Sequence, residues 1–275
     1  MGLKSVMIRE KTKLLRTCFV LAILFLATSG ISWGYVLPGK QIIDLMSDNF
    51  SKFKSMIVVL SIRPAGEEAV EVESGLVQKI WLQTPGFFSK KVMGEKEDQD
   101  SLKVKIQGDI EDYPIFYHLL FMGRGNEAQT ALISRMGIDL NTVSFTRKDG
   151  IIACRIGDPD IKSPCFILEK DRFLPLEIKC CVRGKTGPVM LSIRFEDYRK
   201  IEKGWYPHLV TSFLDGVPWF SCTVKDLETN PPITANLSPI PLENILPAAS
   251  CAGREGDLQK ERFENIIKSL KNRYK

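Results

Sequence analysis

The sequence predicts a mainly β protein: an antiparallel meander that follows one amphipathic helix and is interrupted by a helical insert. Apolar residues recur at helical spacing from Gln41 to Met56, which predicts a helix with one buried face. Short β-branched and aromatic segments then alternate with separators rich in Gly, Pro and Asp, as expected for hairpins. Residues 113–137 break this series, because a wholly apolar run there leads into a helical pattern that ends at Gly137.

The expected strands form two sets on either side of the insert. The first set reads MIVVLSIR, LVQKIWLQ, FFSKKVM and LKVKIQ. The second set reads VSFTR, IIACRI, CFILE, PLEIKCCVR, VMLSIRFEDYR, WYPHLVTSF and WFSCTVKDL. A composition of 44% hydrophobic and 26% charged residues excludes a disordered, collagen-like or polytopic membrane protein.

Residues 1–34 have the pattern of a secretory signal peptide. A basic region ends at Arg16, and ten apolar or small residues follow from Cys18 to Ala27. Small residues at Ser32 and Gly34 favour cleavage after Gly34, and an uncleaved N-terminal anchor is the alternative. Without these residues the chain holds 33 basic and 32 acidic side chains, so the sequence argues against nucleic-acid binding.

Export would place the cysteines in a compartment that permits disulfides. Cys18 would leave with the leader, which leaves six cysteines, none in C-x-x-C spacing. We expect at least one disulfide among four of them: Cys154, Cys165, Cys180 and Cys222. For Cys180 the alternative is a buried free thiol. Strand alternation places Cys181 on the polar face with Glu177, Lys179 and Arg183, opposite the apolar Leu176, Ile178, Cys180 and Val182.

Catalytic and metal-binding motifs are absent from the sequence. There is no G-x-S-x-G elbow, P-loop, G-x-G-x-x-G fingerprint or H-E-x-x-H pair. His118 and His208 are the only histidines, which leaves little for a zinc site or a Cys/His nucleophile pair. We therefore expect no enzymatic activity, no metal and no cofactor.

The insert admits two interpretations that are compatible with each other. It could be a helical cap that covers apolar surface at one end of the sheet. It could also be a lid over a cavity, since Phe116, Tyr117, Leu119, Leu120 and Phe121 could face a ligand.

Several phrases in the sequence resemble the periplasmic outer-membrane lipoprotein-sorting (LolA-like) carrier family. They are the leader, the helix ending in Lys-Phe-Lys-Ser, the turn TPGFF, the insert, DRFLPLEI, RFEDYRKIEKGWYPHLV and VKDLETNPPI, in the family's usual order. The similarity covers nearly all of residues 41–233. In the family the D-x-x-L-P phrase closes one hairpin, the DYR…G…YP pair forms the next, and NPP follows the last strand.

The resemblance implies a half-open antiparallel β-barrel with a helical lid over an apolar cavity that holds acyl chains in the periplasm. It implies lipoprotein acyl chains or other lipid as ligand, with an inner-membrane donor and an outer-membrane acceptor as partners, and a monomer. The family's carriers place an Arg before the Pro of the P-x-x-F turn, where it contacts the lid. This sequence has Thr84 before Pro85.

The resulting division of the chain is a leader (1–34), a half-barrel domain (35–247) with its insert at about 113–137, and a charged C-terminal helix (248–275). Other classes remain open: a periplasmic sensor or partner-binding module on the same fold, and a secreted structural β-domain. In the carrier interpretation, strand alternation and the insert predict the following ligand-binding residues: Leu60, Leu76, Ile80, Leu82, Phe88, Phe116, Leu119, Leu120, Ile178, Leu191, Ile193, Phe195, Phe220 and Val224.

Overall fold

The computed structural model divides the chain into two compact units, Met1–Val36 and Leu37–Lys275. It describes residues 36–65, 76–93, 115–160, 162–184, 187–201 and 204–240. The predicted signal peptide, the predicted strand LKVKIQ and the predicted C-terminal helix lie outside these residues. No helix among the described residues is long and apolar enough to cross a membrane.

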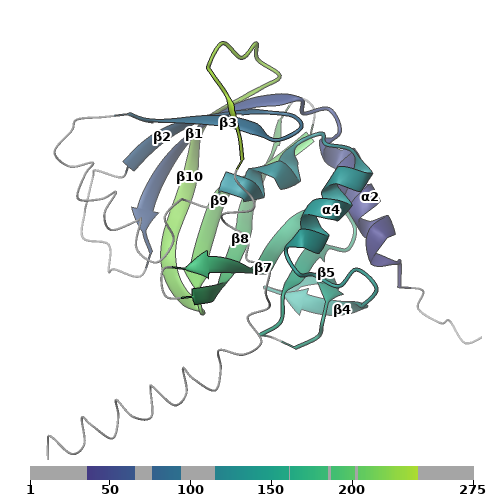
Figure 1. The fold of residues 1–275 in the computed structure, drawn as a ribbon. Helices are drawn as coiled ribbons and strands as arrows, with labels where there is room; N and C mark the ends of the chain where they lie inside the picture. Colours follow the sequence, from purple (N-terminus) through teal and green to yellow (C-terminus); the bar gives the residue numbers. More distant parts are fainter. Residues whose placement is uncertain are drawn as a thin grey trace, which may run out of the picture. The chain divides into compact units, whose positions relative to one another are not determined.

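One antiparallel sheet dominates the second unit, and three helices gather at one side of it (Figure 1). The helices are α2 (Gly39–Phe50), the 3-10 helix η1 (Ile115–Phe121) and α4 (Asn126–Arg135). The strands are β1 (Ser55–Pro64), β2 (Leu76–Gln83), β3 (Phe87–Met93), β4 (Val143–Lys148), β5 (Ile151–Gly157), β6 (Cys165–Glu169), β7 (Pro175–Gly184), β8 (Gly187–Ile201), β9 (Gly204–Leu214), β10 (Val217–Thr229) and β11 (Ser238–Pro239).

The strand order leaves the sheet open. It runs β11-β3-β2-β1-β10-β9-β8-β7-β6-β5-β4, and within the described residues β11 and β4 form the two ends. Neighbouring strands are consecutive in the chain except in two pairs, β1–β10 and β11–β3, which both join strands before the insert to strands near the end of the described chain. The predicted mainly β, half-open antiparallel architecture with an N-terminal helix and a helical insert is confirmed.

The predicted hairpins close where the sequence phrases indicate. DRFLP forms the turn between β6 and β7, with Phe173 at a φ of 53°, and the DYR and YP phrases lie on the paired strands β8 and β9. Asn230 of the NPP stretch follows β10. Its Oδ1 accepts a hydrogen bond from the Lys54 amide at 2.7 Å, and its Nδ2 donates one to the Lys52 carbonyl at 2.9 Å. This asparagine therefore fixes the end of β10 to the segment that leads into β1.

The first helix is shorter than the sequence predicts. The apolar pattern suggested a helix from Gln41 to Met56, but α2 ends at Phe50 and β1 begins at Ser55. The pattern continues because Phe53 and Met56 are both fully buried, although neither is helical. Apolar spacing alone therefore did not distinguish the end of the helix from the start of a buried strand.

Alternation predicts the inner face of β7 correctly from Ile178 onwards but is wrong for Leu176, which packs in the small cluster of the other face, next to an irregularity in the β6–β7 pairing. It predicts the outer face only in part. Ile178, Cys180 and Val182 are fully buried in the main core, as expected. On the opposite face, however, Glu177 is only 3% exposed and Cys181 only 6% exposed. Because the outer face is covered here, the prediction of a solvated face is wrong for these two residues.

The predicted disulfide is also wrong, because Cys154, Cys165, Cys180 and Cys222 are all buried and none of them is disulfide-bonded. The strand register explains this result. Cys154 pairs with Leu168 and packs in the main core, whereas Cys165 pairs with Gly157 and packs in a small cluster on the other face. Burial raises the pKa of the Cys180 thiol to about 12, so this thiol is unreactive at neutral pH.

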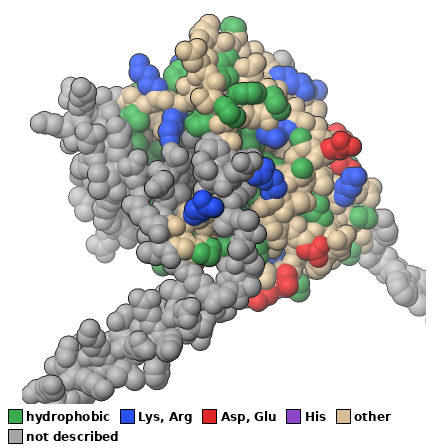
Figure 2. Space-filling model, viewed as in Figure 1, with side chains coloured by type: hydrophobic (Ala, Val, Ile, Leu, Met, Phe, Trp, Pro, Cys, Tyr) green, Lys and Arg blue, Asp and Glu red, His purple; other side chains and the backbone are tan. Residues whose placement is uncertain are grey.

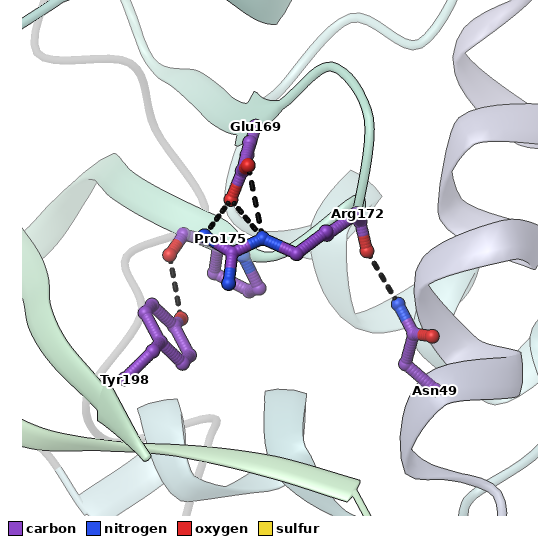
Figure 3. A network of polar contacts seen from close by, with 5 residues as sticks. All are labelled: Asn49, Glu169, Arg172, Pro175 and Tyr198. Atoms are coloured by element: carbon purple, nitrogen blue, oxygen red, sulfur yellow. Dashed lines mark hydrogen bonds and ion pairs between the residues drawn. The ribbon is translucent and has the colours of Figure 1, made fainter. Parts of the chain in front are cut away.

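A polar network joins α2 to the β6–β7 turn (Figure 3). Asn49 Nδ2 donates to the Arg172 carbonyl at 2.7 Å, and the Arg172 guanidinium bonds both carboxylate oxygens of Glu169. Tyr198 of β8 donates its hydroxyl proton to the Pro175 carbonyl at 2.5 Å. These contacts hold the helix against the part of the sheet that carries the DRFLP turn.

Replacing Asn49 with Ala should lower the free energy of unfolding by about 1 kcal/mol, because one side-chain bond between α2 and the turn is lost. Urea titration followed by circular dichroism measures this change. Lys40→Ala, at an exposed position of the same helix, is the control and should shift stability by less than about 0.5 kcal/mol. Equal effects of the two variants would contradict the role given to Asn49.

Candidate functional site

The candidate site is the apolar inner face of the open sheet together with the insert that covers it. Side chains from neighbouring strands stand in register across this face, because the hairpins keep alternate residues on one side. One such row crosses β6 to β10 through paired residues that are all fully buried: Phe166, Ile178, Ile193, Ser212 and Phe220. The row is apolar except for the Ser212 hydroxyl, which has no hydrogen-bond partner.

The insert fills this face with its own side chains. Residues 116–122, from η1 to the residue after it, are all at most 2% exposed. α4 packs behind η1, and Gln129 Nε2 donates to the carbonyls of Leu119, Leu120 and Met122 at 3.1 to 3.2 Å. The insert thus shields the sheet residues that it contacts from water.

Phe121 is the centre of the contact between insert and sheet. Its ring centroid lies 5.2 Å from that of Phe50, 5.3 Å from Phe195 and 5.2 Å from Tyr206, all with steeply inclined planes. These edge-to-face contacts come from α2, β8 and β9, so one side chain joins the helix, the insert and the sheet.

His118 provides a polar contact between insert and sheet. Its Nδ1 lies 2.7 Å from the hydroxyl oxygen of Tyr206 on β9, and its Nε2 is buried without a partner. Complete burial lowers the pKa of His118 from 6.5 to about 3, since the apolar surroundings disfavour the charged imidazolium. The imidazole is therefore neutral at physiological pH.

The corner between η1 and α4 is anchored through backbone groups. The Gly123 amide donates to the Phe53 carbonyl at 2.6 Å, and Lys54 Nζ donates to the Gly123 carbonyl at 3.4 Å. A side chain at Gly123 would not fit, because its Cβ would lie 2.5 Å from the Ser51 carbonyl oxygen. The insert is thus held at this corner to the segment between α2 and β1.

An arginine joins the insert to the TPGFF turn, but it comes from the insert. Nη1 of Arg124 lies against Gly86, where a Cβ would be only 2.8 Å from it. The turn itself carries Thr84 at the position where the resembling carriers have Arg. Arg124 therefore brings the insert into contact with this turn.

The structure brings the predicted ligand-binding residues together. All of them belong to one hydrophobic cluster or pack against it, and all except Phe88 are buried. Their role in ligand binding remains a prediction. Tyr206 and Val210 belong to the same buried cluster although they were not predicted, and strand alternation on β9 indicates both. His118 is buried beside them, and its polar ring gives no sign in the sequence of a place in the core.

Other surfaces differ in character from the inner face. A depression of about 290 Å³ is lined largely by charged residues, including Lys148, Glu169, Arg172 and Arg194. On the face shown in Figure 2, apolar side chains reach the described surface in separate groups, and Lys and Arg side chains are spread among them. Among the described residues, no group of three or more His, Cys, Asp or Glu side chains could hold a metal ion.

Comparison with known proteins gives matches among solved structures. A LolA superfamily protein from Nitrosomonas europaea matches with a TM-score of 0.45 and 11% identity over 72% of this chain and 96% of its own. A domain described as a putative outer membrane lipoprotein-sorting protein domain, from Vibrio parahaemolyticus, matches with a TM-score of 0.40 and 12% identity over 70% of this chain and 92% of its own.

A DUF1329 family protein from Desulfovibrio piger matches with a TM-score of 0.35 and 12% identity, over 71% of this chain and 94% of its own. No family model and no curated protein matches the sequence. The functional argument for this chain therefore rests on its own residues.

Replacing Phe121 with Ala should lower the free energy of unfolding by about 3–5 kcal/mol, because a buried ring with four aromatic neighbours is lost. Phe145→Ala, at a position 46% exposed on β4, should cost less than about 1 kcal/mol. Chemical denaturation of both variants measures the difference. A similar small loss in both would show that the insert is not held through Phe121.

The burial of His118 predicts a pH dependence of stability. Its pKa of about 3 in the folded state lies below its ordinary value, so the unfolded chain binds the proton more readily. The folded state should lose about 2 kcal/mol relative to a His118→Phe variant between pH 7 and pH 5. Stability is measured by denaturation at both pH values.

Tyr206→Phe is the control for this experiment. It removes the hydrogen bond to Nδ1 but leaves the ring buried, and burial is the cause of the lowered pKa. The pH dependence should persist in this variant. Its disappearance would show that the hydrogen bond, and not burial, keeps His118 neutral.

Proposed function

We propose that this protein is a non-catalytic periplasmic carrier that holds acyl chains, of lipoproteins or of other lipids, between the inner face of the open sheet and the insert. The observation that carries the proposal is the row of buried, mostly apolar side chains across β6 to β10, which belongs to the same hydrophobic cluster as the apolar residues of the insert. An acyl chain could replace those residues when the insert moves aside. Burial of each CH₂ group of the acyl chain contributes about 0.8 kcal/mol. This gain can offset the cost of exposing the apolar residues of the insert that the chain replaces.

The contacts of the insert suit a movement about one corner. Gly123 and Arg124 hold the insert to the chain near Phe53 and Gly86, at the end of the insert that leads into α4. The η1 side chains, in contrast, contact the sheet through apolar surfaces that a lipid could match. Movement of η1 would break the contact between His118 and Tyr206 and expose both polar groups to water or to the ligand.

Two further polar atoms support a ligand with a polar end. Ser212 Oγ and Gln78 Oε1 lie among the inner-face residues, buried and without hydrogen-bond partners. An unpaired buried polar group costs about 1–3 kcal/mol. The ester or carboxyl group of a lipid could pair with one of them and recover this cost.

The periplasm and the membrane partners belong to this proposal through the leader and the family resemblance. A carrier of this kind would receive its cargo from an inner-membrane donor and give it to an outer-membrane acceptor. An apolar ligand identified by mass spectrometry in protein purified without detergent would support the carrier most directly.

Hydrogen exchange tests the proposed movement of the insert. Amides of residues 115–137 should exchange faster than those of Leu191–Phe195 in β8, and a long-chain lipid should protect them. Equal protection in both segments, unchanged by fatty acids and by lipoprotein acyl chains, would make the insert a fixed structural cap.

A matched pair of variants tests the inner face. Val224 faces inward and Thr223, its neighbour on β10, is exposed on the outer face. Val224→Glu should weaken binding of a fluorescent fatty acid at least tenfold, because a carboxylate would be placed in an apolar interior. Thr223→Glu should change the affinity less than twofold.

Circular dichroism of both variants must first show the native β spectrum. Binding is then measured by fluorescence titration. Unchanged binding in a folded Val224→Glu protein would contradict the placement of the ligand on this face.

A second candidate, a module that binds a protein partner, has its own supporting observation. The β4–β5 hairpin exposes Phe145, Ile151 and Ile152 by 41% to 47%, and within the described residues β4 is the last strand of the sheet. Exposed apolar side chains on an edge hairpin favour association with another chain. A fixed insert and a lipid-free protein would favour this candidate.

A further inference from the structure

Two cationic side chains lie at the corner that attaches the insert. Lys54 Nζ donates to the Gly123 carbonyl at 3.4 Å, and the next residue of the insert is Arg124. Both residues also contact the turn between β2 and β3. The Thr84 amide donates to the Lys54 carbonyl at 2.9 Å, and Arg124 Nη1 lies against Gly86. Within the described residues, neither Lys54 nor Arg124 forms an ion pair with a carboxylate.

The guanidinium of Arg124 has unused hydrogen-bonding capacity. Its Nε is buried and has no hydrogen-bond partner, whereas buried polar atoms in proteins are normally paired. Burial also lowers the pKa of Arg124 from its ordinary value, as expected for a cation that lacks a carboxylate beside it. Glu127, in the first turn of α4, is exposed to water. An anion from outside the chain would complete the pairing of this guanidinium.

The corner adjoins the apolar side chains of the candidate site. Phe53, next to Lys54, is fully buried in the main core. A Cβ at Gly86 would lie 3.9 Å from a methyl carbon of Leu119 in η1, and the same Cβ would contact Arg124. A molecule bound to the two cations would therefore have apolar surface directly beside it. The corner also stays in place when η1 moves as proposed above.

We propose that Arg124 and Lys54 bind the phosphate of a lipid head group while the acyl chain of that lipid lies on the inner face. The inference rests on the proposed carrier function and specifies the class of its ligand. A guanidinium can donate two parallel hydrogen bonds to phosphate oxygens, and a lysine ammonium adds a compact positive charge. A neutral glyceride would leave both cations unpaired. Free inorganic phosphate offers the same oxygens, so the experiment must separate it from the lipid.

Two fluorescent lipids that differ only in the phosphate test the proposal. They are a nitrobenzoxadiazole-labelled lysophosphatidate and the monoacylglycerol with the same labelled chain. The full chain is titrated with each lipid below its critical micelle concentration, and the ratio of the two dissociation constants gives the preference for phosphate. The unaltered protein should bind the lysophosphatidate roughly tenfold more tightly or better. This preference should decrease as the salt concentration rises.

Substitutions at the corner should reduce this preference. Arg124→Gln should lower it roughly tenfold, and Lys54→Gln, at an exposed position, should lower it about threefold. The ratio is the appropriate measure, because a loosened insert would change both dissociation constants together. Arg147→Gln is the matched control, at an exposed position of β4, and should leave the preference within about twofold. Circular dichroism of each variant must first show the native β spectrum.

The contrary outcomes separate this inference from the carrier function. If the unaltered protein binds both lipids equally, or if neither corner substitution changes the preference, the head-group site is overturned and the carrier function stands. If neither lipid binds, both fall together. Inorganic phosphate at the concentration of the lysophosphatidate should not displace it. Displacement by equal concentrations would identify a site for free phosphate and overturn the assignment to a lipid.

Discussion

The structure depends on one constraint: an open, curved sheet with an apolar inner face must cover that face. A closed barrel would fill its interior with side chains from its own strands, but this sheet ends at β11 and β4 without their pairing in the described part of the chain. The insert and α2 supply the missing cover. Phe121 joins the elements of this cover to one another and to the sheet, because its ring contacts aromatic side chains of α2, β8 and β9.

The strands could be predicted from the sequence because their signal is local. Alternation and turn residues located β1 to β10, and the same alternation placed Ile193 and Phe220 on the inner face. Even the irregular pairing of β1 with β10 near Leu60 left Val224 pointing inward. These features follow from the period of the strand and from the hairpin connections, so no distant contact was needed to find them.

The failures have a common physical origin in contacts between distant segments. Glu177 looked solvated, but Lys148 of β4 forms an ion pair with it at 2.9 Å and Ser192 donates a hydrogen bond to it at 2.6 Å. Burial alone would raise the pKa of Glu177, but the hydrogen bonds from Ser192 and Lys148, together with the charges of Lys148 and Lys179, leave the pKa lowered. The cysteines failed for a similar reason, since a shift of one residue in register decides which face a thiol occupies.

At the corner formed by Gly123, the attachment of the insert is independent of the side chains that η1 presents to the covered face. Docking of the insert there uses the Gly123 amide, the Phe53 carbonyl and the absence of a side chain, and none of these depends on which apolar residues line η1. Substitutions in η1 could therefore change the shape or polarity of the covered face while the attachment of the insert stays the same. Related proteins could therefore acquire new ligands through substitutions in one short helix, while the backbone contact between Gly123 and Phe53 that attaches it stays the same.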